Sequence, residues 1–282
     1  MFKTRFIQKN TQKNTQARPL AGQSVWITGA SAGIGLALSC QAAKLGANVI
    51  LVAPDQTGLQ QAKQQCEQYG GQHLAIVLNV LDSTGCEVAY QQIIATYGKL
   101  DWLINNAGIT HRSSVLETSE QLDDQIFALD YKAPVRLTRL VLQDMLRQQR
   151  GHIVMISSIV GLIGTQQRSS YAAAKSALHL WANSLRAEVE SSGIQVKVVF
   201  PGFVNTNITV SALLPNGQTY GKVDAGQQQA MSAERFAAQA WQKMLNGQNY
   251  IVIGALKDKV GALLSRVAPE LLYKVIRRVK VS

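Results

Sequence analysis

Short apolar runs alternate with segments of helical length through most of this chain, and this alternation constrains its fold more than any other feature. Segments at 119–149 and 169–192 are the longest of the helical stretches. Apolar runs joined by helices are typical of a parallel sheet that is covered on both faces. The sequence therefore predicts one doubly wound α/β domain, with strands at 24–28, 48–53, 73–80, 101–108, 152–158, 194–200 and 249–254.

The two ends of the chain differ from this alternating body. Residues 1–18 carry five bases and no acid, and residues 257–282 carry seven bases against Asp258 and Glu270. Each end therefore contributes +5 of the net charge of +11, which leaves the body close to neutral. We divide the chain into a basic polar arm at 1–20, a folded domain at 21–255 and a basic tail at 256–282.

A near-neutral body excludes the usual nucleic-acid-binding domain, which needs a basic face interleaved with aromatic side chains. The three cysteines and four histidines show no metal-ligand spacing, so we expect a reduced compartment and no metal site. No secretory signal or membrane span is evident. We expect a cytoplasmic protein. The basic ends suit the anionic inner face of a membrane, or they are solvated tails that aid solubility.

Glycine-rich and polar motifs stand where the predicted strands end. In a parallel sheet, ligands bind beyond the carboxyl ends of the strands. The spacing GxxxGxG after the first strand opens a helix, whose free N–H groups and positive dipole end attract phosphates. The sequence therefore predicts a phosphate-binding turn, at the same edge as three further motifs: Asn106 to Gly108, Ser158, and Pro201-Gly202.

Tyr171 and Lys175 are the residues best suited to acid–base chemistry at this edge. If the segment after Ser169 is helical, they lie four residues apart on one helix face. An ammonium there would lower the pKa of the phenol from about 10 toward neutral, so that it could protonate a carbonyl or deprotonate an alcohol. Ser158 could hold the same oxygen. Alone, Tyr-x-x-x-Lys is more typical of a surface helix, but its place after the fifth strand favours a site.

These motifs together resemble the short-chain dehydrogenase/reductase family. The matching segments, in order over about residues 20–255, are TGASAGIG (28–35), NNAG (105–108), Ser158, YAAAK (171–175) and PG (201–202). The resemblance implies a Rossmann-type, three-layer sheet of about seven strands and hydride transfer between a nicotinamide and an alcohol or carbonyl carbon. A narrower resemblance, to the dehydrogenase/reductase member seven branch, implies an apolar or lipid-like substrate and association with membranes.

The resemblance also implies a role for each site residue. Ser158 orients the substrate oxygen, Tyr171 is the general acid/base, and Lys175 lowers the tyrosine pKa and binds the nicotinamide ribose. The implied cofactor-binding residues are Gly29, Ser31, Gly33, Ile34 and Gly35 at the phosphates, Asn79, Val80, Asn106, Ala107 and Gly108 on the adenosine side, and Pro201, Gly202, Val204 and Thr206 along the nicotinamide. A substrate lid near 207–230 and pairing through the long helices into a homodimer or homotetramer are also implied.

Two departures from the family pattern stand out. Asp130 occupies the place of an asparagine that supports a proton-relaying water beside the lysine; an aspartate could hold that water, or its charge could slow the relay. At the second strand, Ala53 replaces the acid usual in NAD-preferring members, and Pro54 replaces the base common in NADP-preferring ones. Ala53 leaves room for a phosphate that Asp55 would repel if it pointed inward. We favour NADP(H) over NAD(H), mainly from the narrower resemblance.

The lid and the tail carry apolar side chains. In the lid, Ile208, Val210, Leu213 and Leu214 suggest an apolar pocket wall or ordinary packing. The tail has the helical spacing of an amphipathic segment, which could lie on an anionic membrane or dock on the protein. Its apolar positions are Leu271, Leu272, Val275, Ile276 and Val279, and its bases are Lys274, Arg277, Arg278 and Lys280.

Two functions follow from these observations. The first is an NAD(P)-dependent oxidoreductase that reduces an apolar carbonyl. The second is a dinucleotide-binding regulator, or a membrane-surface interaction protein, with weak catalysis. Asp130 and the sequence A-P-D at 53–55 favour the second function, while the presence of Ser158, Tyr171 and Lys175 favours the first.

Overall fold

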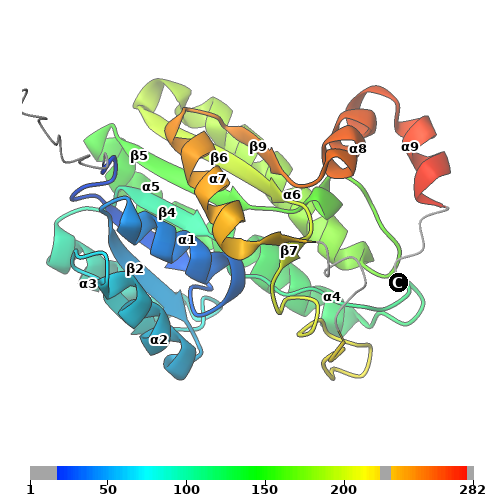
Figure 1. Ribbon diagram of the computed structural model, residues 1–282, viewed down its shortest axis with the longest axis horizontal. Coiled ribbons are helices and arrows are strands. Elements are labelled where there is room, and N and C mark those ends of the chain that lie inside the picture. Colours follow the sequence, from blue (N-terminus) through cyan, green and yellow to red (C-terminus); the bar gives the residue numbers. More distant parts are fainter. Residues whose placement is uncertain (1–17, 223–229, 278–282) are drawn as a thin grey trace, which may run out of the picture.

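The computed structural model describes residues 18–222 and 230–277, and it is built around a seven-stranded parallel sheet (Figure 1). The strand order is β3-β2-β1-β4-β5-β6-β9, and every neighbouring pair runs parallel. The predicted doubly wound α/β fold is confirmed. The strands are β1 (Ser24–Thr28), β2 (Asn48–Ala53), β3 (Leu74–Val77), β4 (Trp102–Asn105), β5 (Gly151–Ile156), β6 (Ile194–Pro201) and β9 (Tyr250–Ile253).

Helices cover both faces of this sheet and form three layers with it (Figure 1). One face packs against α1 (Gly33–Lys44), α2 (Gln56–Glu67) and α7 (Ala233–Leu245). The other packs against α3 (Ser83–Tyr97), α5 (Ala133–Gln148) and α6 (Ser169–Val189). The remaining elements are α4 (Glu120–Phe127), the π-helix η1 (Ala128–Lys132), the 3₁₀ turns η2 (Ile159–Gly161) and η3 (Glu190–Ser192), the short strands β7 (Val204–Asn205) and β8 (Met231–Ser232), α8 (Leu256–Val267) and α9 (Pro269–Ile276). Within the described residues, no helix has the length and apolar character of a membrane span.

The strands are continuous apolar runs because both of their faces are buried. In β1, Val25 and Ile27 belong to the core beneath α1, whereas Trp26 belongs to the core beneath α3. Successive side chains of a strand point to opposite faces, so one strand feeds both cores. Ser232 caps α7, because its hydroxyl accepts a hydrogen bond from the N–H of Arg235 at 3.2 Å.

The element boundaries differ from the expected ones at three places. The apolar runs at 73–80 and 101–108 leave the sheet early, at Val77 and Asn105, and continue as loop at its carboxyl edge. The helical region 119–149 contains the wide turn η1, followed by Pro134, which lacks the N–H that a regular helix would use. Leu20, within the range assigned to the arm, is fully buried in the core. Residues 1–17 of that arm lie outside the described residues.

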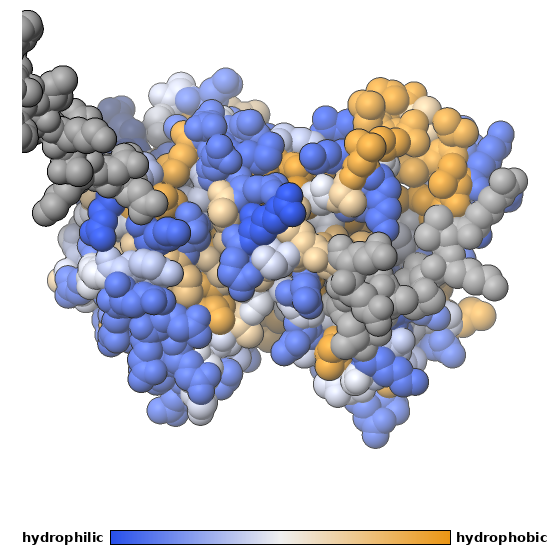
Figure 2. Space-filling view, viewed as in Figure 1, coloured by the Kyte–Doolittle hydropathy of each residue, from blue (hydrophilic) through white to orange (hydrophobic). Residues whose placement is uncertain are grey.

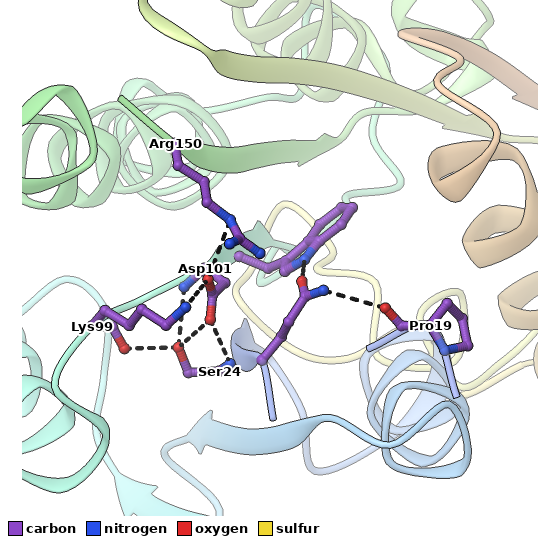
Figure 3. A network of polar contacts seen from close by, with 7 residues as sticks. Pro19, Ser24, Lys99, Asp101 and Arg150 are labelled. Carbon is purple, nitrogen blue, oxygen red and sulfur yellow. Dashed lines mark hydrogen bonds and ion pairs between the residues drawn. The ribbon is translucent and has the colours of Figure 1, made fainter. Parts of the chain in front are cut away.

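Asp101 ties the amino ends of three strands together at the edge opposite the polar motifs (Figure 3). Its Oδ2 accepts a hydrogen bond from the N–H of Ser24, at 3.0 Å, where β1 begins. Its Oδ1 lies 2.9 Å from Lys99 Nζ and 3.8 Å from Arg150 Nε, just before β5. Only 3% of the Asp101 side chain is exposed. The carboxylate therefore satisfies a buried backbone donor and fixes the starts of β1, β4 and β5.

We predict that Asp101→Ala lowers the free energy of unfolding by about 1–3 kcal/mol, because the buried N–H of Ser24 loses its acceptor. Urea denaturation followed by circular dichroism measures this change. Lys99→Ala serves as the control. Its side chain is 43% exposed, so we expect a loss below about 1 kcal/mol. Equal losses in both variants would show that the ion pair, and not the buried hydrogen bond, carries the effect.

Candidate active site

A cavity of about 300 Å³ lies at the carboxyl edge of the sheet, where β1, β4, β5 and β6 end. The structure brings together most of the residues singled out from the sequence, although the chain separates them by up to 177 positions, from Gly29 to Thr206. The predicted residues that line it are Gly29, Gly33, Ile34, Gly35, Asn106, Ala107, Gly108, Asp130, Ser158, Tyr171, Lys175, Pro201, Gly202, Val204 and Thr206.

Four predicted cofactor residues do not line this cavity. Ala53 and Val80 are buried in the two cores of the sheet. Asn79 is exposed, and its side-chain oxygen accepts a hydrogen bond from the N–H of Leu81 at 3.0 Å. Ser31 is partly exposed on the β1–α1 turn. Their contact with a cofactor stays a prediction.

The glycine-rich turn packs directly against the NNAG segment. Gly29 has φ +66°, and a side-chain carbon added there would lie 3.0 Å from the Cα of Ala107. A carbon added at Gly35 would overlap the carbonyl oxygen of Gly29 and lie 2.6 Å from Asn106 Nδ2. Ala32, at the N-cap of α1, makes no side-chain cap. The first N–H groups of α1 are therefore available to a phosphate.

Thr28 and Asn106 join the ends of β1 and β4. The Thr28 hydroxyl accepts hydrogen bonds from the N–H groups of Asn106 and Ala107, both at 3.0 Å. Asn106 Nδ2 donates to the carbonyl oxygen of Thr28 at 2.9 Å. The role of Thr28 was not foreseen, although it begins the quoted segment TGASAGIG. A hydroxyl at the end of the first strand is the signal that could have indicated it.

Lys175 and Asp130 form a buried ion pair behind the cavity. Lys175 Nζ lies 2.7 Å from Asp130 Oδ1, and the two side chains are 5% and 0% exposed. Lys175 also donates to the carbonyl oxygen of Ile156 at 3.2 Å, at the end of β5. Asp130 Oδ2 accepts from the N–H of Ile109 at 3.0 Å. The charges are thus paired and hydrogen-bonded, as burial of charge requires.

Tyr171 lies one helical turn before Lys175 and reaches the same cavity. Lys175 Nζ is 5.8 Å from the centre of the Tyr171 ring, and a hydrogen bond joins Tyr171 to the Ser158 side chain. The N–H of Tyr171 donates to Nε2 of His111 at 3.5 Å. Ser158, Tyr171 and Lys175 therefore line one cavity, and their roles as oxygen-binding hydroxyl, acid–base phenol and cation stay a prediction.

Comparison with known proteins agrees with this geometry. A family model for short chain dehydrogenases matches residues 23–215. The chain belongs to the short-chain dehydrogenase family. It is 33% identical to a dehydrogenase/reductase SDR family protein 7-like of Drosophila melanogaster, over 92% of this chain and 81% of that one. It is 29% identical to dehydrogenase/reductase SDR family member 7B of Rattus norvegicus, over 94% and 83%. The resemblance to the member seven branch is confirmed.

Solved structures of this family share the fold. A short-chain dehydrogenase from Streptomyces avermitilis superposes with a TM-score of 0.76 and 28% identity, over 92% of this chain and 98% of that one. A metagenomic short-chain oxidoreductase in complex with NADP gives a TM-score of 0.68 and 25% identity, over 83% and 98%. Family membership supports a dehydrogenase/reductase that binds a nicotinamide dinucleotide.

The pKa of Tyr171 moves opposite to the predicted direction. Burial raises the pKa of the phenol. Lys175 and the hydrogen bond with Ser158 lower it, but Asp130 raises it again, and the net direction is upward from the ordinary value. The sequence-based expectation considered the ammonium alone. It was wrong because the phenol is buried and the ammonium has a carboxylate beside it.

The ion pair perturbs the pKa of both partners. Burial raises the pKa of the Asp130 carboxyl, and Lys175 and the N–H of Ile109 oppose this effect. Burial lowers the pKa of Lys175, but Asp130 and Tyr171 outweigh it and hold that pKa above its ordinary value. In this short-chain dehydrogenase, direct contact with the Asp130 carboxylate therefore stabilises the ammonium form of Lys175. The family resemblance implies an asparagine at position 130.

Sequence reasoning also missed Arg168, Phe203 and His111, which lie around the site. Arg168, at the start of α6, lines the cavity and lowers the pKa of Tyr171. Phe203 lines the mouth and is 37% exposed. His111 is fully buried behind Tyr171. Each of them lies one to three residues from a quoted motif, and this closeness was the available signal: Arg168 precedes YAAAK, Phe203 follows PG, and His111 follows NNAG.

The described part of the lid only partly matches the expected apolar wall. Ile208 lines the cavity, together with Asn207, Thr209 and Ser211. Val210, Leu213 and Leu214 do not line it. Leu213 instead bonds to the loop after β4, through the carbonyl of Thr110 at 2.9 Å and the N–H of Arg112 at 2.8 Å. These bonds fix the lid backbone against the loop that follows NNAG. Residues 223–229 lie outside the described residues.

We predict that Gly35→Ala raises the dissociation constants of both NADPH and NADH by about tenfold or more, equivalent to about 1.4 kcal/mol, since its methyl group displaces the turn. Calorimetric titration of the two cofactors measures this change. Gly164→Ala is the control, because among the described residues nothing lies within 4 Å of its added carbon. Unchanged affinity in Gly35→Ala would contradict the assignment of this turn to the phosphates.

Proposed function

We propose that this short-chain dehydrogenase is an NAD(P)-dependent oxidoreductase that transfers a hydride between a nicotinamide and the carbonyl or alcohol carbon of an apolar or lipid-like substrate. The observation that carries the proposal is the meeting of Ser158, Tyr171 and Lys175 in one cavity with an uncapped helix start. A regulator that only binds a dinucleotide would not need an acid–base phenol beside a buried ammonium.

The roles of the side chains follow from their places. Bound at the uncapped start of α1, a reduced nicotinamide cofactor supplies the hydride that the carbonyl carbon gains. Ser158 and Tyr171 hold the carbonyl oxygen, and the phenol O–H bond breaks as the new alcohol O–H bond forms. Lys175 stabilises the phenolate that remains. Lys175 Nζ forms an ion pair with Asp130 and donates a hydrogen bond to the carbonyl oxygen of Ile156. An ammonium has three donors, so a further N–H would serve the ribose.

Apolar side chains near the reacting groups support an apolar substrate. Ile109, Phe203 and Ile208 line the cavity, and Phe203 and Ile208 are 37% and 42% exposed at its mouth. Burial of such surface against a substrate contributes about 25 cal/mol for each Å². An aliphatic or aromatic carbonyl compound therefore fits this entrance better than a charged one.

The end of β2 bears on cofactor choice. The carboxylate of Asp55 accepts a hydrogen bond from the N–H of Gly58 at 3.1 Å and caps α2. Ala53 presents no acid to the ribose hydroxyls. This arrangement, together with the NADP complex of a structural relative, supports NADP(H) over NAD(H). The ratio of the two dissociation constants of the wild type measures the preference, and clearly tighter NADH binding would reverse it.

We predict that Tyr171→Phe lowers kcat by about 10²–10⁴-fold in NADPH-dependent reduction of apolar ketones, since the proton donor is lost. Cofactor binding should stay within about twofold of wild type, which is under 0.5 kcal/mol. A panel of aliphatic and aromatic ketones, followed by cofactor absorbance, measures the rates. Bound cofactor with no turnover that depends on Tyr171, over the whole panel, would favour the regulatory alternative.

A second feature supports contact with a membrane surface. Helix α8 exposes four apolar side chains at spacings of four, three and four, which we call the α8 stripe: Leu256, Val260, Leu263 and Val267, between 45% and 76% exposed. In Figure 2 this stripe and α9 form a hydrophobic patch. The opposite side of α8 docks on the body through buried Gly261 and Ala262. A stripe of this kind is typical of an interfacial helix.

The charges around the α8 stripe fit an anionic surface. Lys257 and Lys259 are exposed on its two flanks, whereas the acid Asp258 is buried and accepts from the N–H of Ala255 at 2.8 Å. Lys257 Nζ also lies 5.6 Å from the ring centre of Phe203, at the mouth of the cavity. We propose a peripheral protein whose α8 stripe rests on anionic lipid, on the inner membrane face, close to the substrate entrance.

The tail contributes less than the sequence suggested. In α9, Leu272 is buried, while Leu271 and Val275 are exposed beside the α8 stripe. The amphipathic pattern therefore serves partly to dock the helix. Arg278, Val279 and Lys280 lie outside the described residues. The proposed homodimer or homotetramer would use α5 and α6 instead, where Leu180 is 61% exposed.

We predict that Val267→Glu lowers flotation with vesicles of phosphatidylcholine and phosphatidylglycerol by about tenfold or more, because burial of one valine contributes about 1.5–3 kcal/mol. Val88→Glu is the matched control, since Val88 is 60% exposed on α3. Wild type should not float with pure phosphatidylcholine. If both variants float like wild type, or if light scattering shows that only Val267→Glu changes the oligomer, the stripe is not a lipid contact.

A further inference from the structure

The direct contact between Asp130 and Lys175 changes the charge that faces Tyr171. With 2.7 Å between Lys175 Nζ and Asp130 Oδ1, no water separates the two groups. Both side chains are sealed from solvent. Whether the shared proton rests on the amine or on the carboxyl, the pair has a net charge of zero. An asparagine in the place of Asp130 would leave the ammonium uncompensated.

The chain holds Asp130 in this position with its backbone. The π-helix η1 widens the turn that carries Asp130 and points its side chain at the NNAG loop. The N–H of Ile109 binds the second carboxylate oxygen at 3.0 Å. Gly108 permits the approach, because an added side-chain carbon would overlap Asp130 Oδ1 and lie 3.1 Å from Lys175 Nζ. The carboxylate is therefore fixed on the ammonium.

Three other titratable or charged residues lie around Tyr171. Arg168, at the start of α6, favours the phenolate. His111 touches the backbone of Tyr171, and burial lowers its pKa, so the imidazole is neutral at neutral pH. Asp123, on α4, interacts with His111 and with the hydroxyl of Ser170. The charged and hydroxyl groups that line the cavity and act on Tyr171 are the Asp130–Lys175 pair, the Ser158 hydroxyl and Arg168.

We propose that Asp130 is a positioning residue that neutralises Lys175, so that Tyr171 stays protonated through neutral and mildly alkaline pH and the enzyme rests as a proton donor for carbonyl reduction. The proposal rests on the proposed function. It adds the protonation state that Tyr171 has before the substrate binds. Reduction needs the phenol to give its O–H proton to the substrate oxygen. Oxidation of an alcohol needs the phenolate to accept one.

The overall equilibrium of the reaction limits which measurements can reveal the role of Asp130. At any one pH, the ratio of kcat/KM in the two directions is fixed by the overall equilibrium, so Asp130 cannot alter that ratio. Asp130 can instead set the pH at which kcat/KM for reduction begins to decline and kcat/KM for oxidation begins to rise. The pH profile of kcat/KM reports the pKa of the essential acid. A protonated Tyr171 extends the plateau of the reduction profile to higher pH.

The first experiment needs no turnover. Ultraviolet difference spectra between wild type and Tyr171→Phe follow the ionisation of this one phenol among the eight tyrosines. In wild type we expect ionisation at or above the ordinary phenol pKa of about 10. In Asp130→Asn, paired with Asp130→Asn/Tyr171→Phe, we expect it at least about one pH unit lower, since removal of a nearby charge shifts a pKa by about 1–3 units. Ionisation of wild-type Tyr171 near neutral pH would overturn the proposal.

The second experiment uses the pH profile of kcat/KM for ketone reduction. In Asp130→Asn, the pH at which reduction declines should fall by the same amount as the spectral pKa. The control is Asp124→Asn, the same change at an exposed position of α4, which should leave the profile unchanged. A lower rate in Asp130→Asn with no shift in either measurement would show a purely structural role. If no substrate turns over, the spectral titration still tests Asp130.

Discussion

The buried ammonium of Lys175 is the group around which the cavity is arranged. A charge with only 5% of its side chain exposed must be paired and hydrogen-bonded, and its partners come from two separate parts of the chain. Asp130 belongs to η1, and the carbonyl of Ile156 lies at the end of β5. The next residue, Ser157, donates its hydroxyl to the backbone carbonyl of Lys175 at 3.0 Å. These contacts fix α6, and with it Tyr171, against the sheet.

Close approach of backbones at the carboxyl edge makes this arrangement possible. A carbon added at Gly161 would lie 2.9 Å from the carbonyl carbon of Lys175, and carbons added at Gly35 and Gly108 would overlap neighbouring polar atoms. The glycines therefore bring the turn, the NNAG loop and α6 closer together than side chains would allow. The Asp101 network fixes the opposite edge of the same strands, so the carboxyl edge is held by a rigid sheet (Figure 3).

The fold and the meeting of the strand-end motifs could be predicted because they depend on local patterns, whereas the roles of the individual cavity residues came from the family resemblance. Strands that are buried on both faces appear in the sequence as continuous apolar runs. Motifs that follow such strands meet at the carboxyl edge of the parallel sheet. The π-helix at Asp130, the burial of Leu20 and the α8 stripe depend on tertiary packing, which single-sequence periodicity does not contain. The pKa of Tyr171 was mispredicted for the same reason. The spacing of Tyr171 and Lys175 does not indicate that the carboxylate of Asp130, 45 residues before Lys175, contacts the ammonium.

An aspartate in place of an asparagine at position 130 changes the volume of the side chain little, but it adds a negative charge beside Lys175. A lone ammonium 5.8 Å from the ring of Tyr171 would interact with a phenolate by about 3 kcal/mol at an effective dielectric constant of about 20, equivalent to about two pKa units. A carboxylate 2.7 Å from that ammonium reduces its field to that of a dipole. The geometry of Ser158, Tyr171 and Lys175 is thus retained while the proton affinity of the phenol changes. The proposed role of Asp130 is therefore to tune the acid–base chemistry of Tyr171 through Lys175, without touching the substrate.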